Sequence, residues 1–576
     1  MSVAHSEQRH RRGQFAHRGE STTTGAGMRR DVGTIGLLFA GVGSIIGSGW
    51  LFGAMNASQL AGPAAILSWA IGAVMILLIA IVYAELGTMF PVSGGVIRFP
   101  HISFGSFASY TTGWVTWLAA AAVAPIEVEG ALQYATRYFA FTKEHTTGAG
   151  ETVHTLTGLG YAVAVVAMAV FVVINYYGIR WFARVNTVAV WWKLGVITLV
   201  IIAFMVTKFH AGNFHTHGFA TDGMHGVFTA IATGGIVFSF LGFRQGVELA
   251  GETSNPRRNV PIAVVGSVLI TAVIYVLLQL AFIVTVDPSA LSHGWSGLSD
   301  QLANSAGPLA AIASAIGLGW LATLLYIDAV ISPADTGLVY TTVTGRLSYA
   351  MARNGNAPRG LARVTARGVP LVSLVLTFIV GLIVFLPFPS WQQLVGFITS
   401  ATVLSFGSGP IVLAAMRREL RDHDRPFRVP GGDVIPFLAF YASNLIVMWA
   451  GWDTDWKLFA AVGLGFVMLA IFHLTDRGAM PQMDLKAGAT WLLPWMAGLC
   501  LISYLGDYPE KSAGAGNRAL IGFGWGFLVV LGLSMIVWAV AMRVRLPRAE
   551  VDRHVEQTTL EAQLEDQELG AAYPSA

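Results

Sequence analysis

Charged residues are scarce in this sequence. Only 12% of its 576 residues are Asp, Glu, Lys or Arg, about half of the ~25% that soluble domains carry. Hydrophobic residues make up 54%, and the formal net charge is only +3. The basic residues stand singly between apolar runs, which is not typical of a nucleic-acid-binding surface. This composition excludes an ordinary soluble domain and indicates an integral membrane protein without a nucleic-acid partner.

Cysteine and several catalytic signatures are also missing. The single cysteine, Cys500, excludes an intramolecular disulfide and a cysteine-based metal cluster. The sequence contains no GxxxxGK[ST] phosphate loop, which argues against an ATP-driven pump, and no HExxH motif or nucleophile elbow. We therefore expect no enzyme activity, no cofactor, no metal and no use of ATP. A channel is disfavoured too, because neither a continuous polar pore nor repeated filter segments are visible.

Long apolar stretches are abundant. Stretches of about 20 residues are long enough to cross a bilayer as helices. The predicted spans are 33–54, 64–88, 111–134, 158–178, 185–206, 226–250, 260–286, 318–350, 371–388, 391–416, 433–451, 457–475, 490–506 and 519–541. The shorter stretch 304–316 predicts an interfacial helix before the eighth span.

The basic residues predict the orientation of these spans. With the N-terminus inside, 27 of the 35 Lys and Arg residues fall in cytoplasmic segments and six in external ones, as the positive-inside rule requires. The other two, Lys193 and Arg244, lie deep inside spans. We expect a multi-pass protein of the plasma membrane with both termini in the cytoplasm.

Glycine interrupts the first and the sixth span. The segments are GLLFAGVGSIIGSGWLFG and IATGGIVFSFLGFRQGVELAGE. Glycine tolerates non-helical backbone, so these spans can unwind in mid-membrane. Free N–H groups of one half-helix then bind a carboxylate, and carbonyls of the other bind an ammonium; an α-amino acid carries both groups. The alternative is close helix packing through small residues, but two such spans five helices apart favour an inverted repeat.

Three motifs carry a resemblance to a known family. In order they are GVGSIIGSGWLFG (41–53), FSFLGFRQGVELAGETSNPRRNVP (238–261) and GRLSYAMARNGNAP (345–358). Together they resemble the amino acid–polyamine–organocation (APC) superfamily of secondary transporters, over about residues 30–420. The segments PIEVE (125–129), FLGFRQ (240–245) and YIDAVISPADTG (326–337) are most similar to bacterial aspartate–proton symporters.

The resemblance implies an all-α polytopic fold with a five-plus-five inverted repeat. The transport core would span 33–420, with discontinuous helices 1 and 6, and 421–545 would add four helices. Residues 1–32 and 546–576 would be cytoplasmic tails; the second is polar, and we expect a short solvated helix or disorder there. The substrate site would lie between spans one, three, six and eight.

The resemblance also implies which residues bind the substrate. Backbone N–H groups of Gly47, Ser48 and Gly49, with the Ser48 hydroxyl, would hold the carboxylate. The carbonyl oxygens of Ile45, Phe238 and Leu241 would receive the α-amino group. The ring of Phe238 would close over the substrate as a gate; the alternative is an ordinary ring facing lipid or the core.

Lys193 is the predicted proton-coupling residue. It lies about 12 Å inside the cytoplasmic end of span five, at 1.5 Å per residue, where a charge costs about 2.5–3.5 kcal/mol on insertion scales. Proton-coupled members of the superfamily have a lysine here in place of sodium. Thr336 or Ser332 would supply a partner hydroxyl. The alternative is snorkelling to the interface, for which Lys193 is deep.

The remaining charged residues in the spans leave alternatives open. Glu85 closes span two and is predicted to be structural. Glu127 and Glu129 project about 200° apart on a helix, so at most one faces the site, and we favour Glu127. Arg244 either pairs internally, with Glu248, Glu127 or Glu129, or offers its guanidinium to a second carboxylate on the substrate.

These features together predict a function. We expect a secondary active transporter that imports an amino acid, aspartate or glutamate, by proton symport and alternating access. Its partners would be the amino acid, protons and membrane lipids. The alternatives are a transporter or exchanger of neutral amino acids or polyamines, and an amino acid receptor that does not transport.

Overall fold

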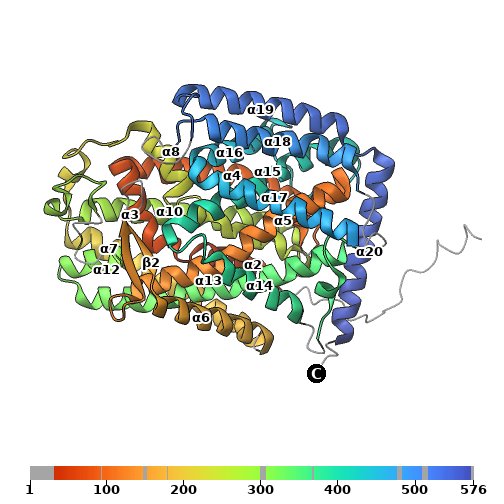
Figure 1. The fold of residues 1–576 in the computed structure, drawn as a ribbon. Helices are drawn as coiled ribbons and strands as arrows, with labels where there is room; N and C mark the ends of the chain where they lie inside the picture. The colour runs from red at the N-terminus through yellow and green to blue at the C-terminus, as the bar shows by residue number, and fades with distance from the viewer. Residues whose placement is uncertain are drawn as a thin grey trace, which may run out of the picture.

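The computed structural model describes residues 32–92, 94–146, 152–177, 179–298, 302, 306–365, 369–475, 483–508 and 517–572. Nearly all of the N-terminal tail predicted over 1–32 therefore lies outside the described residues. The described chain is a bundle of long helices that run side by side (Figure 1). The predicted all-α polytopic fold is confirmed.

The first half of the chain contains both broken spans. Its elements are α2 (Thr34–Ile45), α3 (Gly49–Ala61), η1 (Gly62–Ala64), α4 (Ala65–Met89), α5 (Gly95–Ala135), β1 (Thr142–Thr146), β2 (Thr152–Leu156), α6 (Gly158–Tyr177), α7 (Ile179–Thr207), η2 (Ala211–Phe214), α8 (Gly223–Thr233), η3 (Phe238–Arg244), α9 (Gln245–Glu248), η4 (Ala250–Glu252) and α10 (Pro256–Thr285).

The second half continues the helical pattern. Its elements are η5 (Pro288–Leu291), α12 (Pro308–Ala315), α13 (Gly319–Arg353), η6 (Arg359–Ala362), α14 (Leu371–Val384), α15 (Trp391–Glu419), α16 (Val434–Ala450), α17 (Trp452–Thr475), α18 (Leu485–Leu505), α19 (Phe523–Val544) and α20 (Arg548–Ala572). α12 coincides with the predicted interfacial helix.

Ten helical segments of the described chain are long and apolar enough to cross a membrane, or eleven when the bent pair α8 and η3–α9 is one span. One of the ten, Gly49–Met89, runs through α3 and α4. The prediction was fourteen spans. Three of these predicted spans are not among the eleven. They coincide with the apolar helices α2, α14 and α16, whose 12, 14 and 17 residues are fewer than a straight crossing needs.

Burial separates the central helices from those that face lipid. The most apolar stretch of α15 is 100% buried and that of α5 89% buried, whereas that of α17 is only 17% buried. α5 packs along α13 and α15, while α10 packs against α2 and α4. Apolar side chains exposed on the outer helices meet no penalty in lipid, so this surface is that of a membrane protein.

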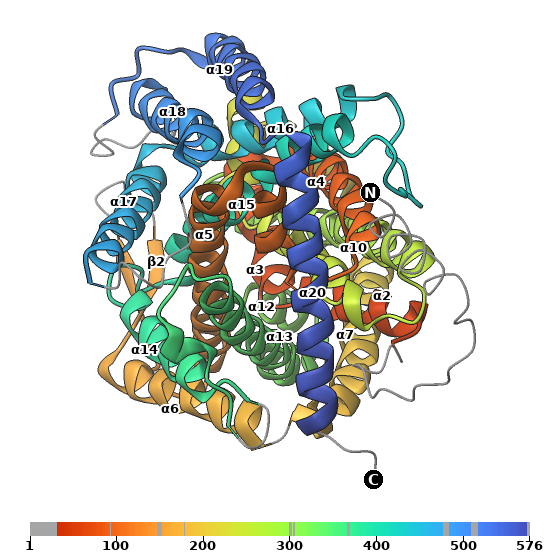
Figure 2. The same ribbon diagram turned by 90° about the vertical axis from the view of Figure 1, so that its right-hand side faces the viewer.

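Two elements differ from the expectation. β1 and β2 form an antiparallel hairpin, which apolar periodicity did not predict. The tail after Leu546 is the long helix α20, which runs across the helix ends at the right of Figure 1 and in front of them in Figure 2. It is docked rather than solvated: Val551 is 2% exposed, and the ring of His554 stacks on that of His101 of α5, at 4.4 Å between centroids. The hairpin lies at the opposite end of the bundle.

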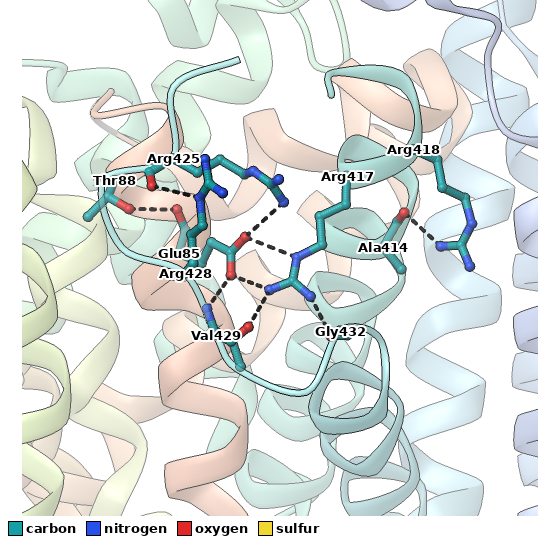
Figure 3. A network of polar contacts seen from close by, with 9 residues as sticks. All are labelled: Glu85, Thr88, Ala414, Arg417, Arg418, Arg425, Arg428, Val429 and Gly432. Atoms are coloured by element: carbon teal, nitrogen blue, oxygen red, sulfur yellow. Dashed lines mark hydrogen bonds and ion pairs between the residues drawn. The ribbon is translucent and has the colours of Figure 1, made fainter. Parts of the chain in front are cut away.

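Glu85 anchors the loop that follows α15 (Figure 3). Its Oε1 accepts a 3.0 Å hydrogen bond from Arg417 Nε, and Arg417 Nη2 donates to Oε2. The backbone N–H of Val429 also donates to Oε2, at 2.7 Å, and Arg425 lies 3.8 Å away. A fully buried carboxylate is tolerated because two guanidinium groups and an amide surround it. Glu85 therefore ties α4 to α15 and to the loop that follows α15, and it does not line the cavity described below.

Candidate functional site

The first broken span separates α2 from α3. α2 ends at Ile45, and Ile46 adopts φ −86° and ψ 86°, which no helix continues. The N–H of Gly47 turns back to the Ile45 carbonyl at 3.1 Å, and α3 begins at Gly49. The predicted interruption of the first span is therefore present, at the residues where glycine is concentrated.

The second broken span touches the first. α8 ends at Thr233, Gly235 has φ +91°, and η3 follows with a bend of 45°. A Cβ on Gly242 would lie 2.3 Å from the carbonyl carbon of Ser44. Only glycine allows this approach, so η3 lies directly against the end of α2.

A small cavity lies between the two breaks. Its volume of about 10 Å³ is about that of one water molecule, so an amino acid fits only when its walls move apart. Of the predicted site residues, Ile45, Phe238, Leu241, Arg244 and Thr336 line it, and Glu127 lines it as well. Gly47, Ser48, Gly49 and Lys193 do not.

Glu127 occupies the position predicted for the substrate carboxylate. Its Oε2 accepts a 2.6 Å hydrogen bond from the backbone N–H of Ser48. The Ser48 hydroxyl is also engaged, because it accepts a 2.8 Å hydrogen bond from Trp391 Nε1. Glu129 does not line the cavity, and both of its carboxylate oxygens are buried without a hydrogen-bond partner among the residues that the structure describes. Glu127 is thus the member of the pair that faces the site.

Lys193 bridges three helices behind the cavity. Its ammonium donates to the Gly43 carbonyl at 2.9 Å and to Thr336 Oγ1 at 3.2 Å. It also forms an ion pair of 2.7 Å with Asp335, which sequence reasoning missed. Ser332, the other predicted partner, donates instead to Asp328 at 2.7 Å. Lys193 is 0% exposed, so it does not snorkel to the interface.

Arg244 is buried without the expected internal partner. Its Nε and Nη1 atoms have no hydrogen-bond partner among the described residues, and Glu248 Oε1 has none either. The predicted ion pair between these two residues is therefore not formed in this structure. The guanidinium lies over the ring of Tyr340, 5.6 Å from its centroid. A cationic group at the cavity wall is left available for an anion.

Phe238 lies at the cavity wall as the gate hypothesis requires. Its ring is 8% exposed and contacts Trp391 edge to face, at 5.9 Å between centroids. The Ile45 carbonyl, predicted to receive the substrate amine, accepts a 3.3 Å hydrogen bond from Tyr275 Oη. The aromatic residues Trp391 and Tyr275 therefore hold the predicted binding groups in place, and no motif had singled them out.

A polytopic helical bundle built around two facing broken helices has the architecture of a secondary transporter. The sequence comparisons agree with this class. The chain belongs to the amino acid permease family, whose model matches residues 36–476. The members of this family are permeases and not enzymes, and the resemblance to the APC superfamily is confirmed.

Three relatives show how far the similarity extends. The glutamate/serine transporter AimA of Bacillus subtilis (strain 168) is 37% identical over 516 residues, which cover 89% of this chain and 94% of that protein. The aspartate-proton symporter of the same organism is 33% identical over 90% of this chain and 96% of its own length. Its branched-chain amino acid permease BcaP is 27% identical over 77% of this chain and 93% of its length.

Proposed function

We propose that this amino acid permease imports an acidic amino acid together with protons, by alternating access between the two faces of the membrane. Residues 33–420 would form the transport core, and 421–545 would add four helices. The protein would lie in the plasma membrane, with both termini in the cytoplasm. The excess of basic residues in the segments assigned to that side supports the orientation.

The contacts of Lys193 carry the proton-coupling proposal. Its ammonium joins the carbonyl of Gly43 in the first broken span to Asp335 and Thr336 of α13. A carbonyl near the C-terminal end of a half-helix is a cation-binding group. Loss of the lysine proton would remove the charge that holds α2 against α13, so protonation would set whether the broken span can move.

Arg244 supports an acidic cargo. It lines the cavity and is 2% exposed, with two guanidinium nitrogens available. A planar guanidinium binds a carboxylate with two parallel hydrogen bonds, and a buried site strengthens them. The same charge repels polyamines. Two relatives described above, the glutamate/serine transporter AimA and the aspartate-proton symporter, support the same substrate class.

Reconstituted protein tests the coupling. Lys193→Ala should abolish accumulation of aspartate driven by a pH gradient, because the first broken span loses the titratable group that links it to α13. Exchange of labelled for unlabelled aspartate at equal pH should persist. Lys208→Ala is the matched control, since Lys208 is exposed just beyond the same helix, and it should behave like wild type.

Three outcomes would contradict the proposal. Uphill accumulation by Lys193→Ala under a pH gradient would show that another residue couples transport. Wild-type uptake that follows a sodium gradient at constant pH would exclude protons as the coupling ion. Binding without any uptake would make the protein a receptor.

A further inference from the structure

Asp328 is a second buried carboxylate close to Lys193 and outside the cavity lining. It lies on α13 and is 0% exposed. Its Oδ1 accepts hydrogen bonds from Trp192 Nε1 at 2.9 Å and from Ser332 Oγ at 2.7 Å. Its Oδ2 is buried and has no hydrogen-bond partner in the part of the chain that the structure describes. One oxygen is therefore fully engaged and the other is free to carry a proton.

The charges around Asp328 do not balance when every group is ionised. The groups that face it are Lys193 and Trp192 from α7, Trp50 from α3, Tyr134 from α5 and Ser332 on its own helix. Lys193 is the only cation among them, and Asp335 already neutralises it at 2.7 Å. A second ionised carboxylate without a counter-ion in a buried site is strongly unfavourable, and binding of a proton removes that penalty.

The position of Asp328 on α13 connects it to the Lys193 pair. Residues 328, 332 and 336 are spaced four apart, so they form a column on one face of the helix. Thr336 accepts from Lys193 at 3.2 Å, which places the lysine at one end of this column and Asp328 at the other. The column runs from Lys193 toward the start of α13 at Gly319, the outer side in the orientation proposed above.

We propose that Asp328 is a second proton-binding site, which receives the coupling proton from the outer side and passes it through Ser332 to the Lys193–Asp335 pair. In this step the protonated carboxyl of Asp328 turns so that its O–H takes the place of Oδ1 beside Ser332, and the Ser332 hydroxyl turns from Asp328 toward Asp335. The O–H bond at Asp328 then breaks, and its proton binds the Ser332 oxygen. The hydroxyl proton of Ser332 moves on to the Asp335 carboxylate, one turn further along α13, and Ser332 is left unchanged. Protonated Asp335 no longer neutralises Lys193, and the tie between α13 and the first broken span is weakened. The inference rests on the proposed proton symport.

The test compares Asp328→Asn with wild type in proteoliposomes. The asparagine oxygen can still accept from Trp192 and Ser332, so the fold is kept, but the side chain cannot exchange a proton. We expect aspartate accumulation under a pH gradient to fall to the level reached without one. Aspartate exchange at equal pH should remain, and proton entry that accompanies aspartate, followed with a trapped pH dye, should be lost.

Asp455→Asn is the matched control. Asp455 is also 0% exposed and accepts a 2.8 Å hydrogen bond from a serine, Ser503, but it lies on α17 and does not line the cavity between the broken spans. It should leave proton-driven accumulation unchanged. As a second measurement, the infrared C=O band of a protonated buried carboxyl should be present in wild type and diminished in Asp328→Asn.

The outcomes separate this inference from the proposed function. If a pH gradient drives aspartate accumulation equally in wild type and in Asp328→Asn, the role of Asp328 is wrong and the proposed proton symport still stands. Loss of exchange together with accumulation in that variant would also overturn it, because Asp328 would then be structural. If aspartate uptake by wild type does not depend on the proton gradient, proton symport is wrong, and so is the role of Asp328 that rests on it.

Discussion

Oε2 of Glu127 lies 2.6 Å from the backbone nitrogen of Ser48 and accepts its hydrogen bond. The N–H group that we predicted to bind the carboxylate of the substrate thus donates to a carboxylate of the protein. A Cβ on Gly47 would lie 2.5 Å from Glu127 Oε1, so the glycine is what lets the carboxylate approach. Because the neighbouring cavity holds about one water, we predict that the substrate displaces Glu127 as it binds.

This displacement predicts that aspartate binding depends on Glu127 and on pH. Deprotonated Glu127 competes for the Ser48 N–H, so binding to wild type should weaken as pH rises. Glu127→Gln removes the charged competitor, and a hydrogen bond to a charged group contributes about 1.5–3 kcal/mol, or roughly 10- to 100-fold in affinity. We expect tighter binding at high pH and a flat pH profile for the variant, measured by calorimetry.

The matched control is Glu129→Gln. Glu129 is a buried carboxylate two residues away that does not line the cavity, and this variant should keep the pH dependence of wild type. Equal pH profiles for Glu127→Gln and wild type would show that Glu127 does not compete with the substrate.

The contact between the two broken spans predicts a large effect of one methyl group. A Cβ at position 242 would lie 2.3 Å from the Ser44 backbone, so Gly242→Ala must push η3 away from α2. Overpacking of this kind costs about 1–3 kcal/mol, and here it also displaces Leu241 and Arg244 at the cavity wall. We expect binding of every substrate to fall together, in a thermal-shift assay of purified protein.

Gly195→Ala provides the comparison for this variant. A Cβ on Gly195 meets nothing within 4 Å, and alanine favours a helix over glycine by about 1 kcal/mol. This variant should bind as wild type does and unfold at the same or a higher temperature. Normal binding by Gly242→Ala would mean that the close approach of the two spans is not needed for the site.

The broken spans and the deep lysine could be predicted because their signals are local. Glycines at 47, 49, 234 and 235 mark where the helices end, and a lysine in the middle of an apolar run is visible without a structure. Apolar length also located the spans, although it made no distinction between full crossings and the short helices α2, α14 and α16. The burial of a long apolar face determines these elements, and the sequence shows that face directly.

The partners of these residues could not be predicted, since they depend on how distant helices pack. Asp335 lies 142 residues from Lys193, and Arg417 lies 332 residues from Glu85. Arg244 and Glu248 have the spacing of an ion pair on one helix, and the turn between them, α9, is α-helical. Spacing alone predicts that pair, but Arg244 lines the cavity and lies over Tyr340, a residue of the distant helix α13.

The hairpin between α5 and α6 predicts a pH-dependent local stability. Burial lowers the pKa of His154 below its usual 6.5, although nearby Glu144 raises it in part. The unfolded hairpin then binds more protons than the folded one, so stability increases with pH. The contribution is complete above pH 6.5 and is lost as pH falls from there through the lower folded value. Hydrogen exchange of the β1 and β2 amides, corrected for intrinsic rates, should show weaker protection below pH 6.5.

His154→Gln should remove this pH dependence, because glutamine does not titrate. His217→Gln, at an exposed histidine outside the hairpin, should leave it as in wild type. Protection that is constant across pH 6.5 in wild type, or a His154→Gln variant with the wild-type slope, would contradict the assignment.

Arg244 predicts the selectivity of transport. It is the one basic side chain that lines the cavity among the described residues, and no carboxylate forms a hydrogen bond with its Nε or Nη1. Arg244→Gln keeps a polar side chain but loses the charge, and each charge-assisted hydrogen bond contributes about 1.5–3 kcal/mol. Uptake of aspartate should therefore fall roughly 10- to 100-fold, while uptake of serine, which lacks the second carboxylate, should change little.

Arg363→Gln, at an exposed arginine, is the control and should alter the uptake of neither substrate. An equal loss for both substrates, or a wild type that does not transport aspartate or glutamate, would make Arg244 a structural residue that rests on Tyr340, and the cargo would then be a neutral amino acid.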